Sequence, residues 1–384
     1  MKKIYSLSTF LILGFFSIVT TFYFPYLNQQ IGLSLLEVGK VVSVGALFTL
    51  IGQPLLTNFY SKSKSKKNFM LSYLVFVFAT IIFLMSININ NAFIYAPFHG
   101  IILGSFAGIF EIYIEEISTR SNYEFSDVRK WGSIGYGFIV FFGGLIITSL
   151  SYKYLHYFAL FIVLLLMILI KFKFIDFKAE NKHRKSSTKI IDVLKNKKVI
   201  FLIIIIFLGM GSYMGLDFAY SPYLLSILGD ADKANTIYSN SITFRVLIEF
   251  FSFLVVSKYI NRINSKKALI FALVVASIRI LMFSTGSVTL IVIGDQLHGV
   301  MYGVYLSFLF KYLREILEDK LVPISFALLS VLSTGGSNFI YPSIYTKIEL
   351  LFGYTGMYVF AFLLVIISVI LFVILLPNKI TNEK

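Results

Sequence analysis

Cysteine is absent from this 384-residue sequence, tryptophan occurs once, histidine occurs four times, and charged residues make up only 14% of the chain. Without thiols there are no disulfides, thiolate metal sites or cysteine nucleophiles. Four scattered histidines also argue against a histidine-rich metal centre. The sequence shows no phosphate-binding glycine loop and no Ser/His/Asp grouping, so we expect neither an enzyme nor a bound cofactor or metal.

Apolar side chains dominate the composition instead. They account for 58% of the residues, and the mean hydropathy is +0.84. Uncharged runs such as 156–170 and 359–376 approach the roughly 20 residues that cross about 30 Å of hydrocarbon as a helix. The alternation typical of a transmembrane β-barrel is missing. The sequence therefore predicts an all-α integral membrane protein.

The net charge of +15 is concentrated in loops between the apolar runs. Lys and Arg gather at 62–67, 178–189, 261–267 and 311–320, and the intervening loops carry almost none. By the positive-inside rule we place the basic loops and both termini in the cytoplasm, and we expect a multi-pass protein of a bacterial inner membrane. Anionic membrane lipids explain the positive charge better than nucleic acid does. The basic and then apolar start, 1–16, predicts an uncleaved first helix rather than a secretory signal.

Hydropathy divides the chain into about twelve spans. They lie near 6–28, 35–60, 69–88, 92–118, 128–150, 154–175, 199–227, 235–259, 267–286, 288–313, 322–346 and 352–377. One long polar linker predicts an N-terminal half at 1–175, a basic cytoplasmic linker at 176–198 and a C-terminal half at 199–384. The triplet Ser-Lys-Lys recurs at 65–67 and 265–267, after the second span of each half. Two six-helix halves are the architecture of major facilitator transporters, whose sites lie near the bilayer midplane between the halves. We expect a monomer.

A polar turn in the first half is flanked by two charges deep in apolar sequence. Glu111 lies nine residues before Arg120, and Arg129 lies nine residues after it. In an antiparallel helix hairpin both would lie on the order of 13 Å from the turn, so a carboxylate and a guanidinium would face one another inside the bilayer. The alternative is that Arg129 reaches back to the membrane surface and Glu111 belongs to a partly solvated helix end. An intramembrane Glu is costly, which favours a polar binding cavity.

The same stretch carries groups suited to a sugar. Glu111 would accept hydrogen bonds from hydroxyls, Arg129 would donate them, and Tyr136 or Trp131 would offer a flat aromatic face. Residues 110–137 resemble the matching hairpin of the lactose permease-like oligosaccharide:proton symporter family in the Glu-to-Arg separation, the "RSNYEF" turn and the Gly-x-x-Gly-aromatic pattern. The resemblance implies that Glu111 and Arg129 hold the sugar and that Tyr136, where the family has Trp, stacks on its ring.

The pattern Arg-x-Trp-Gly-Ser, which contains Trp131 and Ser133, is also similar to a broader group that includes permeases for nucleosides and aromatic acids. We include both residues in the expected substrate-binding set. The substrate class therefore stays open between sugars and these smaller molecules.

The second half places an unusual density of charge within or beside its apolar spans. The residues are Asp217, Arg245, Glu249, Arg279, Asp295, His298 and Lys311. Each unpaired charge costs at least a few kcal/mol at mid-bilayer. We expect Arg245 and Lys311 at the membrane interface, and Glu249, Arg279 and the pair Asp295/His298 in a cavity. Asp295 and His298 stand three residues apart on one helix face, where they can share a proton or a hydrogen bond.

The family resemblance covers most of the chain. It recurs at 23–27, 260–281, 297–298, 310–313 and 353–359. It implies that Arg279 and His298 belong to the proton-coupling region, with Asp217 near a charge-pair position.

Two replacements complicate proton coupling. Where the family has its protonated Glu this chain has Met301, and where the family has a Lys it has Asp295. If protons are coupled, Glu249 or Asp295 must carry them, held protonated by an apolar setting and discharged when Arg279 approaches. The alternatives are an uncoupled facilitator and purely structural ion pairing.

The leading interpretation is a symporter that takes up a sugar or oligosaccharide together with protons by alternating access. A permease or exporter for nucleosides or small aromatic acids is the alternative among transporters. An intramembrane lipid-modifying transferase, or a receptor with a transporter fold, is the alternative from other classes. Glycines at 99–110, 132–144 and 298–304 are expected to serve close helix packing rather than ligand binding.

Overall fold

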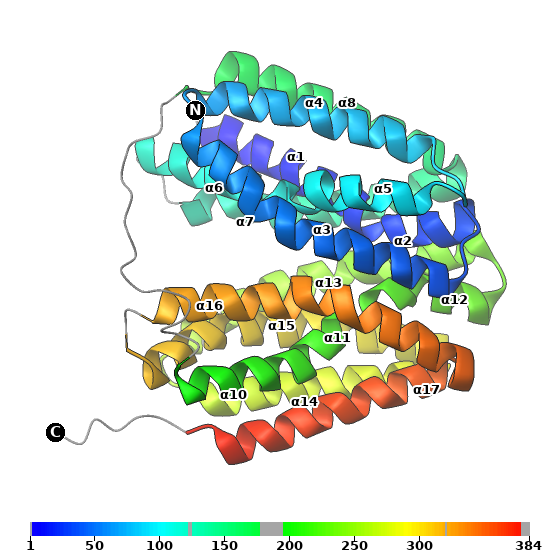
Figure 1. Ribbon diagram of the computed structural model, residues 1–384, viewed down its shortest axis with the longest axis vertical. Helices are drawn as coiled ribbons and strands as arrows, with labels where there is room; N and C mark the ends of the chain where they lie inside the picture. Colours follow the sequence, from blue (N-terminus) through cyan, green and yellow to red (C-terminus); the bar gives the residue numbers. More distant parts are fainter. Residues whose placement is uncertain (1, 122–124, 177–194, 319–320, 378–384) are drawn as a thin grey trace. The chain divides into compact units, whose positions relative to one another are not determined.

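The computed structural model describes residues 2–121, 125–176, 195–318 and 321–377, and within these ranges every regular element is a helix (Figure 1). Contacts divide the chain into two compact units. The first comprises Met1–Lys182 and Phe218–Thr243, and the second comprises His183–Asp217 and Phe244–Lys384. The short segment 218–243 thus groups with the N-terminal unit although it follows the linker expected at 176–198. Most of that linker lies outside the described residues, and the division into six plus six spans stays a prediction.

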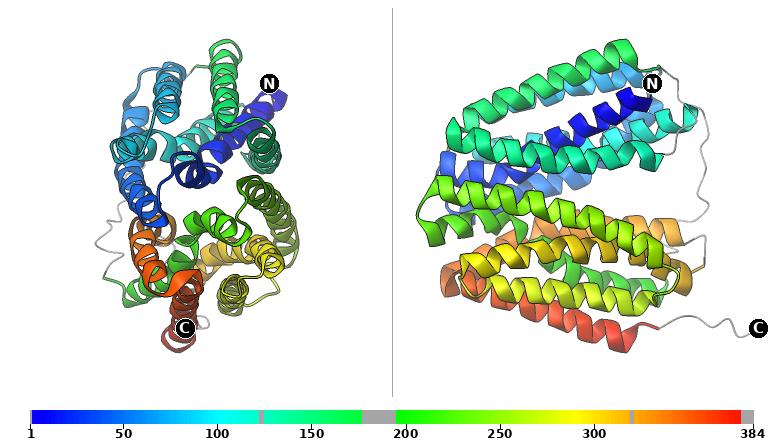
Figure 2. Two further views of the ribbon diagram at one scale, coloured as in Figure 1. Left: turned by 90° about the vertical axis from the view of Figure 1, so that its right-hand side faces the viewer. Right: turned by 180° about the vertical axis from the view of Figure 1, so that it is seen from behind.

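In the part of the chain that the structure describes, the first unit contains ten helical elements before the linker. They are α1 Lys2–Thr21, α2 Tyr23–Pro25, the π-helix η1 Tyr26–Gln30, α3 Leu35–Lys62, α4 Lys66–Met85, α5 Ala92–Phe98, the π-helix η2 His99–Gly104, α6 Phe106–Arg120, α7 Phe125–Ser149 and α8 Tyr152–Lys173. α12 Tyr220–Leu228 and the first part of α13 Ala231–Tyr259 complete the unit. α1 and α7 run side by side through it (Figures 1 and 2).

The second unit begins with a helix that is interrupted several times. Its elements are α10 Lys197–Ile206, the π-helix η3 Phe207–Gly211, α11 Ser212–Met214, the rest of α13, α14 Ser265–Phe283, α15 Val288–Ile316, α16 Val322–Val331, the π-helix η5 Leu332–Gly336 and α17 Ser337–Leu375. The 3₁₀ turn η4, Asp217–Ala219, lies where the chain passes from one unit to the other. α14 packs between α15 and α17 (Figure 2).

Nine helical segments among the described residues are long and apolar enough to cross a membrane. α14 and α15 coincide with the spans expected at 267–286 and 288–313, but their charged and polar residues keep them out of these nine. The 39-residue α17 joins two expected spans across Gly353, whose φ of 67° lies in the left-handed region that favours glycine. The helices therefore fall where the sequence predicts them, and the count of twelve spans stays a prediction.

Side chains cap the basic helix starts. Ser65 accepts a hydrogen bond from the Asn68 N–H at 3.0 Å at the start of α4. In the second copy of the Ser-Lys-Lys triplet the cap is shifted by one residue, because Asn264 accepts from the Lys267 N–H at 3.0 Å. Such caps satisfy backbone N–H groups that have no helical partner.

Two lysines donate hydrogen bonds to backbone carbonyls at the C-terminal ends of helices. Lys66 donates to the carbonyls of Tyr60 and Ser61 at the end of α3. Lys311 donates to Ile260 O at 2.6 Å and to Ile263 O at 3.0 Å just beyond α13. In each case a cation meets the negative end of a helix dipole. Lys311 therefore stabilises the end of α13, near the boundary where the sequence places it.

Glycines bring α7 against its neighbours, as the sequence predicts. A Cβ on Gly135 would lie 2.1 Å from the Phe10 carbonyl oxygen of α1, and one on Gly144 would lie 2.0 Å from the Ser239 hydroxyl oxygen of α13. Contacts under 3.0 Å leave no room for a side chain. α7 is thus held closely both to α1 and to the segment 218–243.

Candidate functional site

Glu111 and Arg129 meet as an ion pair in the first unit. Arg129 Nε donates to Glu111 Oε1 at 2.6 Å, from α7 to α6. The side chains of Arg129 and Glu111 are 34% and 40% exposed, so the pair is partly buried and still accessible. Equal distance from the turn places both at the same depth, and the pairing that the spacing predicts is confirmed. A guanidinium and a carboxylate held in this way still have free donors and lone pairs for a ligand.

The face of α7 decides which neighbours join this pair. Ser133 and Tyr136 follow Arg129 by four and seven residues, so they lie on the same face at about 100° per residue. Trp131 lies about 200° around the helix, and its side chain is 44% exposed. The helical period therefore places Trp131 on another face of α7 than Arg129, and its role as an aromatic face for the substrate stays a prediction. An exposed Trp near a helix start is typical of the membrane interface.

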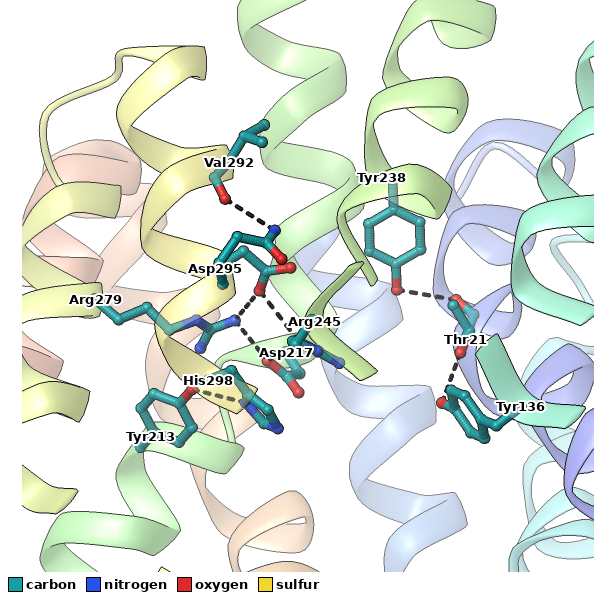
Figure 3. A network of polar contacts seen from close by, with 11 residues as sticks. Thr21, Tyr136, Tyr213, Asp217, Tyr238, Arg245, Arg279, Val292, Asp295 and His298 are labelled. Atoms are coloured by element: carbon teal, nitrogen blue, oxygen red, sulfur yellow. Dashed lines mark hydrogen bonds and ion pairs between the residues drawn. The ribbon is translucent and has the colours of Figure 1, made fainter. Parts of the chain in front are cut away.

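Tyr136 is held by Thr21, the last residue of α1. The two hydroxyl oxygens are 2.8 Å apart, and the Thr21 carbonyl accepts a hydrogen bond from the Tyr238 hydroxyl at 3.0 Å (Figure 3). Thr21 and Tyr238 are buried, and Tyr136 is half-buried. The orientation of the proposed stacking ring is therefore fixed by a polar chain.

Four charged side chains form a network in the second unit. Asp295 Oδ1 accepts from Arg279 Nη2 at 2.8 Å and from Arg245 Nη1 at 3.2 Å (Figure 3). Asp217 Oδ1 accepts from Arg279 Nη2 at 3.2 Å and lies 3.7 Å from Arg245 Nη1. We call Asp217, Arg245, Arg279 and Asp295 the charge quartet. Two arginines and two aspartates balance, so the group is neutral when all four are ionised.

Burial in the quartet is uneven. The side chains of Asp295, Arg279 and Arg245 are 0%, 4% and 12% exposed, whereas that of Asp217 is 30% exposed. The expectation that Arg245 lies at the membrane interface is therefore wrong. Buried charges are retained only where partners compensate their lost hydration, and Arg245 compensates both aspartates.

Asp217 lies where the first helix of the second unit is interrupted. The helix passes through the π-helix η3, ends α11 at Met214, and turns at Gly215 before η4 begins at Asp217. A Cβ on Gly215 would lie 2.5 Å from Cβ of Tyr341, so the turn packs directly on α17. The irregular backbone lets this carboxylate reach α13 and α14 together.

His298 has a different partner from the one expected. Its Nδ1 lies 2.7 Å from the Tyr213 hydroxyl on α11, and the two rings are stacked (Figure 3). Asp295, three residues earlier on α15, pairs with the arginines instead. The guanidinium of Arg279 also lies over the Tyr213 ring, 4.8 Å from its centroid. Tyr213 therefore contacts both His298 and Arg279, a member of the charge quartet.

Glu249 and Met301 lie near members of the charge quartet along the chain. Glu249 follows Arg245 by one turn of α13 and is half-buried, and its backbone packs against Gly299 of α15. Met301 is completely buried on α15. Among the described residues, no group of three His, Asp or Glu side chains is placed to hold a metal ion.

Sequence reasoning missed Thr21, Tyr213 and Tyr238. Each is a hydroxyl in an apolar run, so none disturbs hydropathy as a charge does. One signal for Thr21 was present: the residue four positions later is Pro25, which has no N–H to donate. Helical bonding therefore leaves the Thr21 carbonyl open for a side-chain donor.

Long apolar helices, glycine-mediated packing and buried, balanced charges define a multi-pass membrane transporter with the major facilitator fold. The chain belongs to the MFS_1 like family, whose model matches residues 4–344. A lactose permease of Klebsiella oxytoca is 24% identical over 335 residues, which cover 78% of this chain and 77% of the relative. A raffinose permease of Escherichia coli is 31% identical over 150 residues, 36% of this chain and 35% of the relative. A mutant of the nucleoside transporter NupG has a solved structure with a TM-score of 0.85 at 14% identity, covering 97% of this chain and 98% of that one.

Proposed function

We propose that this protein carries a sugar or oligosaccharide across the cytoplasmic membrane of a bacterium by alternating access, with both of its termini in the cytoplasm. The observation that carries the proposal is the partly exposed ion pair of Glu111 and Arg129, with Tyr136 on the same face of α7 as Arg129. A carboxylate accepts from sugar hydroxyls, a guanidinium donates to them, and a tyrosine ring packs on the apolar face of a pyranose. The permeases for lactose and raffinose that resemble this chain support a saccharide as the substrate.

Protons are the proposed coupling ion. In the charge quartet, protonation of either aspartate would leave a guanidinium without its counter-charge, so proton binding and the arrangement of Arg245 and Arg279 depend on one another. Asp217 is the carboxylate that water reaches more easily, since Asp295 is fully buried. Met301 offers no carboxylate, so we assign the proton to the quartet or to Glu249.

Two assays in proteoliposomes of the purified protein test the two parts of the proposal. Counterflow of a labelled compound into vesicles loaded with lactose, raffinose, a nucleoside or an aromatic acid tests the substrate. Net influx into vesicles without internal substrate, with internal pH recorded, tests the coupling. We expect exchange of a saccharide, blocked by Glu111→Gln, and acidification of the lumen when the saccharide flows inward. Exchange of nucleosides but not of any saccharide would overturn the sugar assignment. Net saccharide influx without proton movement would overturn coupling and leave the binding site in place.

A further inference from the structure

The segment Phe218–Thr243, formed by α12 and the start of α13, docks on the rest of the first unit through buried polar contacts. We call it the docked hairpin. Asn235 Nδ2 donates to Gln29 Oε1 at 2.7 Å, and the Tyr152 hydroxyl donates to the same oxygen at 3.0 Å. Thr243 Oγ1 lies 3.3 Å from the Gly137 carbonyl oxygen, next to Tyr136. At Gly144 the helices α7 and α13 touch without room for a side chain.

The chain enters and leaves this hairpin at two defined points. It arrives through the 3₁₀ turn that begins at Asp217, and it leaves α13 between Thr243 and Phe244. Asp217 and Arg245 of the charge quartet flank these points. Helical bonding is interrupted at the entry, a position of the kind that absorbs hinge motion, whereas α13 continues unbroken past Thr243.

One residue connects the docked hairpin with the proposed sugar site. Thr21 uses its hydroxyl to hold Tyr136 at 2.8 Å and its carbonyl to accept from Tyr238 of the hairpin at 3.0 Å (Figure 3). Because Pro25 has no N–H, that carbonyl has no helical donor at the usual position, and Tyr238 supplies one. Loss of the Tyr238 hydroxyl would leave a buried acceptor without a partner, which costs more than the bond itself.

We propose that Thr21 is a positioning residue of the sugar site, which fixes Tyr136 through its hydroxyl and ties that ring to the docked hairpin through its carbonyl. Sugar affinity then depends on whether the hairpin is docked, and by linkage bound sugar favours docking to the same extent. The inference rests on the proposed function for its ligand, and it adds Thr21 and Tyr238 to the residues that set affinity.

The absence of native cysteine makes the docking directly measurable. Ser239→Cys places a thiol of similar size at a side chain that is 2% exposed and packed against Gly144. Its labelling by a maleimide, in purified full-length protein, reports undocking. Ser17→Cys, in the fully buried part of α1, reports general loosening. Thr20→Val and Tyr26→Phe are matched controls, because their hydroxyls donate to the carbonyls of Phe16 and Leu84.

We expect Tyr238→Phe to speed labelling of the Ser239→Cys thiol at least about fivefold without sugar, because one neutral hydrogen bond typically contributes that factor and the unpaired Thr21 carbonyl adds to it. Lactose or raffinose should slow labelling when Ser239→Cys is the only change in the chain. Tyr238→Phe and Thr21→Val should each weaken binding of that sugar about fivefold, and together they should weaken it by less than the product. The two control substitutions should change neither quantity, and the Ser17→Cys thiol should stay unlabelled throughout.

Two results contradict the inference in different ways. Sugar binding that is unchanged by Tyr238→Phe and Thr21→Val, with the Ser239→Cys thiol labelled at the parent rate, overturns the positioning role alone. Failure of the parent chain to bind any saccharide overturns the proposed function, and the role of Thr21 in it.

Discussion

Asp295 and Arg279 form a hydrogen-bonded ion pair of 2.8 Å between α15 and α14, and the two side chains are 0% and 4% exposed. Asp295 also accepts a hydrogen bond from a second arginine, Arg245, at 3.2 Å. A carboxylate at this position, where the related symporters are expected to have a lysine, is tolerated because two cations converge on it. Asp217 then supplies the second negative charge that the two arginines require.

Breaking the quartet should be costly, and restoring its balance should recover much of the loss. We expect Asp295→Asn or Arg245→Gln alone to destabilise the protein by about 3 to 5 kcal/mol, because a buried charge loses its partner. The double substitution should cost less than the sum of the two, since it removes one charge of each sign. Thermal unfolding of the purified protein measures this.

The exposed pair of Lys2 and Asp127, 2.7 Å apart, is the control for burial. Asp127→Asn should hardly change the melting temperature, because water replaces the lost partner. Equal effects of Asp127→Asn and Asp295→Asn would contradict the assignment of the quartet's stability to buried charge.

Replacing either member of the pair Glu111–Arg129 should weaken sugar binding while the fold persists. Hydrogen bonds to charged groups contribute about 1.5 to 3 kcal/mol each, so Glu111→Gln and Arg129→Lys should weaken binding roughly 10- to 100-fold. Equilibrium binding of labelled lactose or raffinose is the measurement. Lys130→Gln, whose partner is Asp127 at 3.1 Å, serves as the neighbouring control and should bind sugar normally.

Tyr213→Phe should separate proton coupling from sugar exchange. The change leaves His298 without the hydroxyl 2.7 Å from its Nδ1, and it keeps the ring on which Arg279 lies. We expect normal counterflow but reduced accumulation driven by a pH gradient, and a stability loss of about 1 to 3 kcal/mol for the unsatisfied buried group. A variant that accumulates sugar as well as the parent protein would show that His298 and Tyr213 are structural.

Gly135→Ala should force α1 and α7 apart, because the new Cβ would meet the Phe10 carbonyl oxygen at 2.1 Å. Overpacking of this kind costs about 1 to 3 kcal/mol. In Gly45→Ala the nearest atom is the Ala96 carbonyl oxygen at 3.6 Å, an ordinary contact, so this control should be neutral or slightly stabilising. Unfolding of both variants in detergent gives the comparison, and similar stabilities would contradict the close contact at Gly135.

The sequence by itself determined the helical membrane class, the places where most helices begin and end, and the pairing of Glu111 with Arg129. These features depend on local quantities: runs of apolar residues set helix length, and equal separation from a single turn sets equal depth. The aromatic partner was less certain from sequence, because Tyr136 and Trp131 are both near Arg129 along the chain. Only the helical period separates them, and it favours Tyr136.

Tertiary structure alone decided the partners of the charges in the second unit and the position of residues 218–243. Arg245 looks interfacial in sequence because charge alone does not show which helices converge on it, and the spacing of Asp295 and His298 cannot reveal that each has a nearer partner on another helix. Thr21 and Tyr238 are 217 residues apart and carry no charge, so no local pattern connects them. Their contact exists because Pro25 leaves a carbonyl open in α1 and the packing of α13 brings a hydroxyl to it.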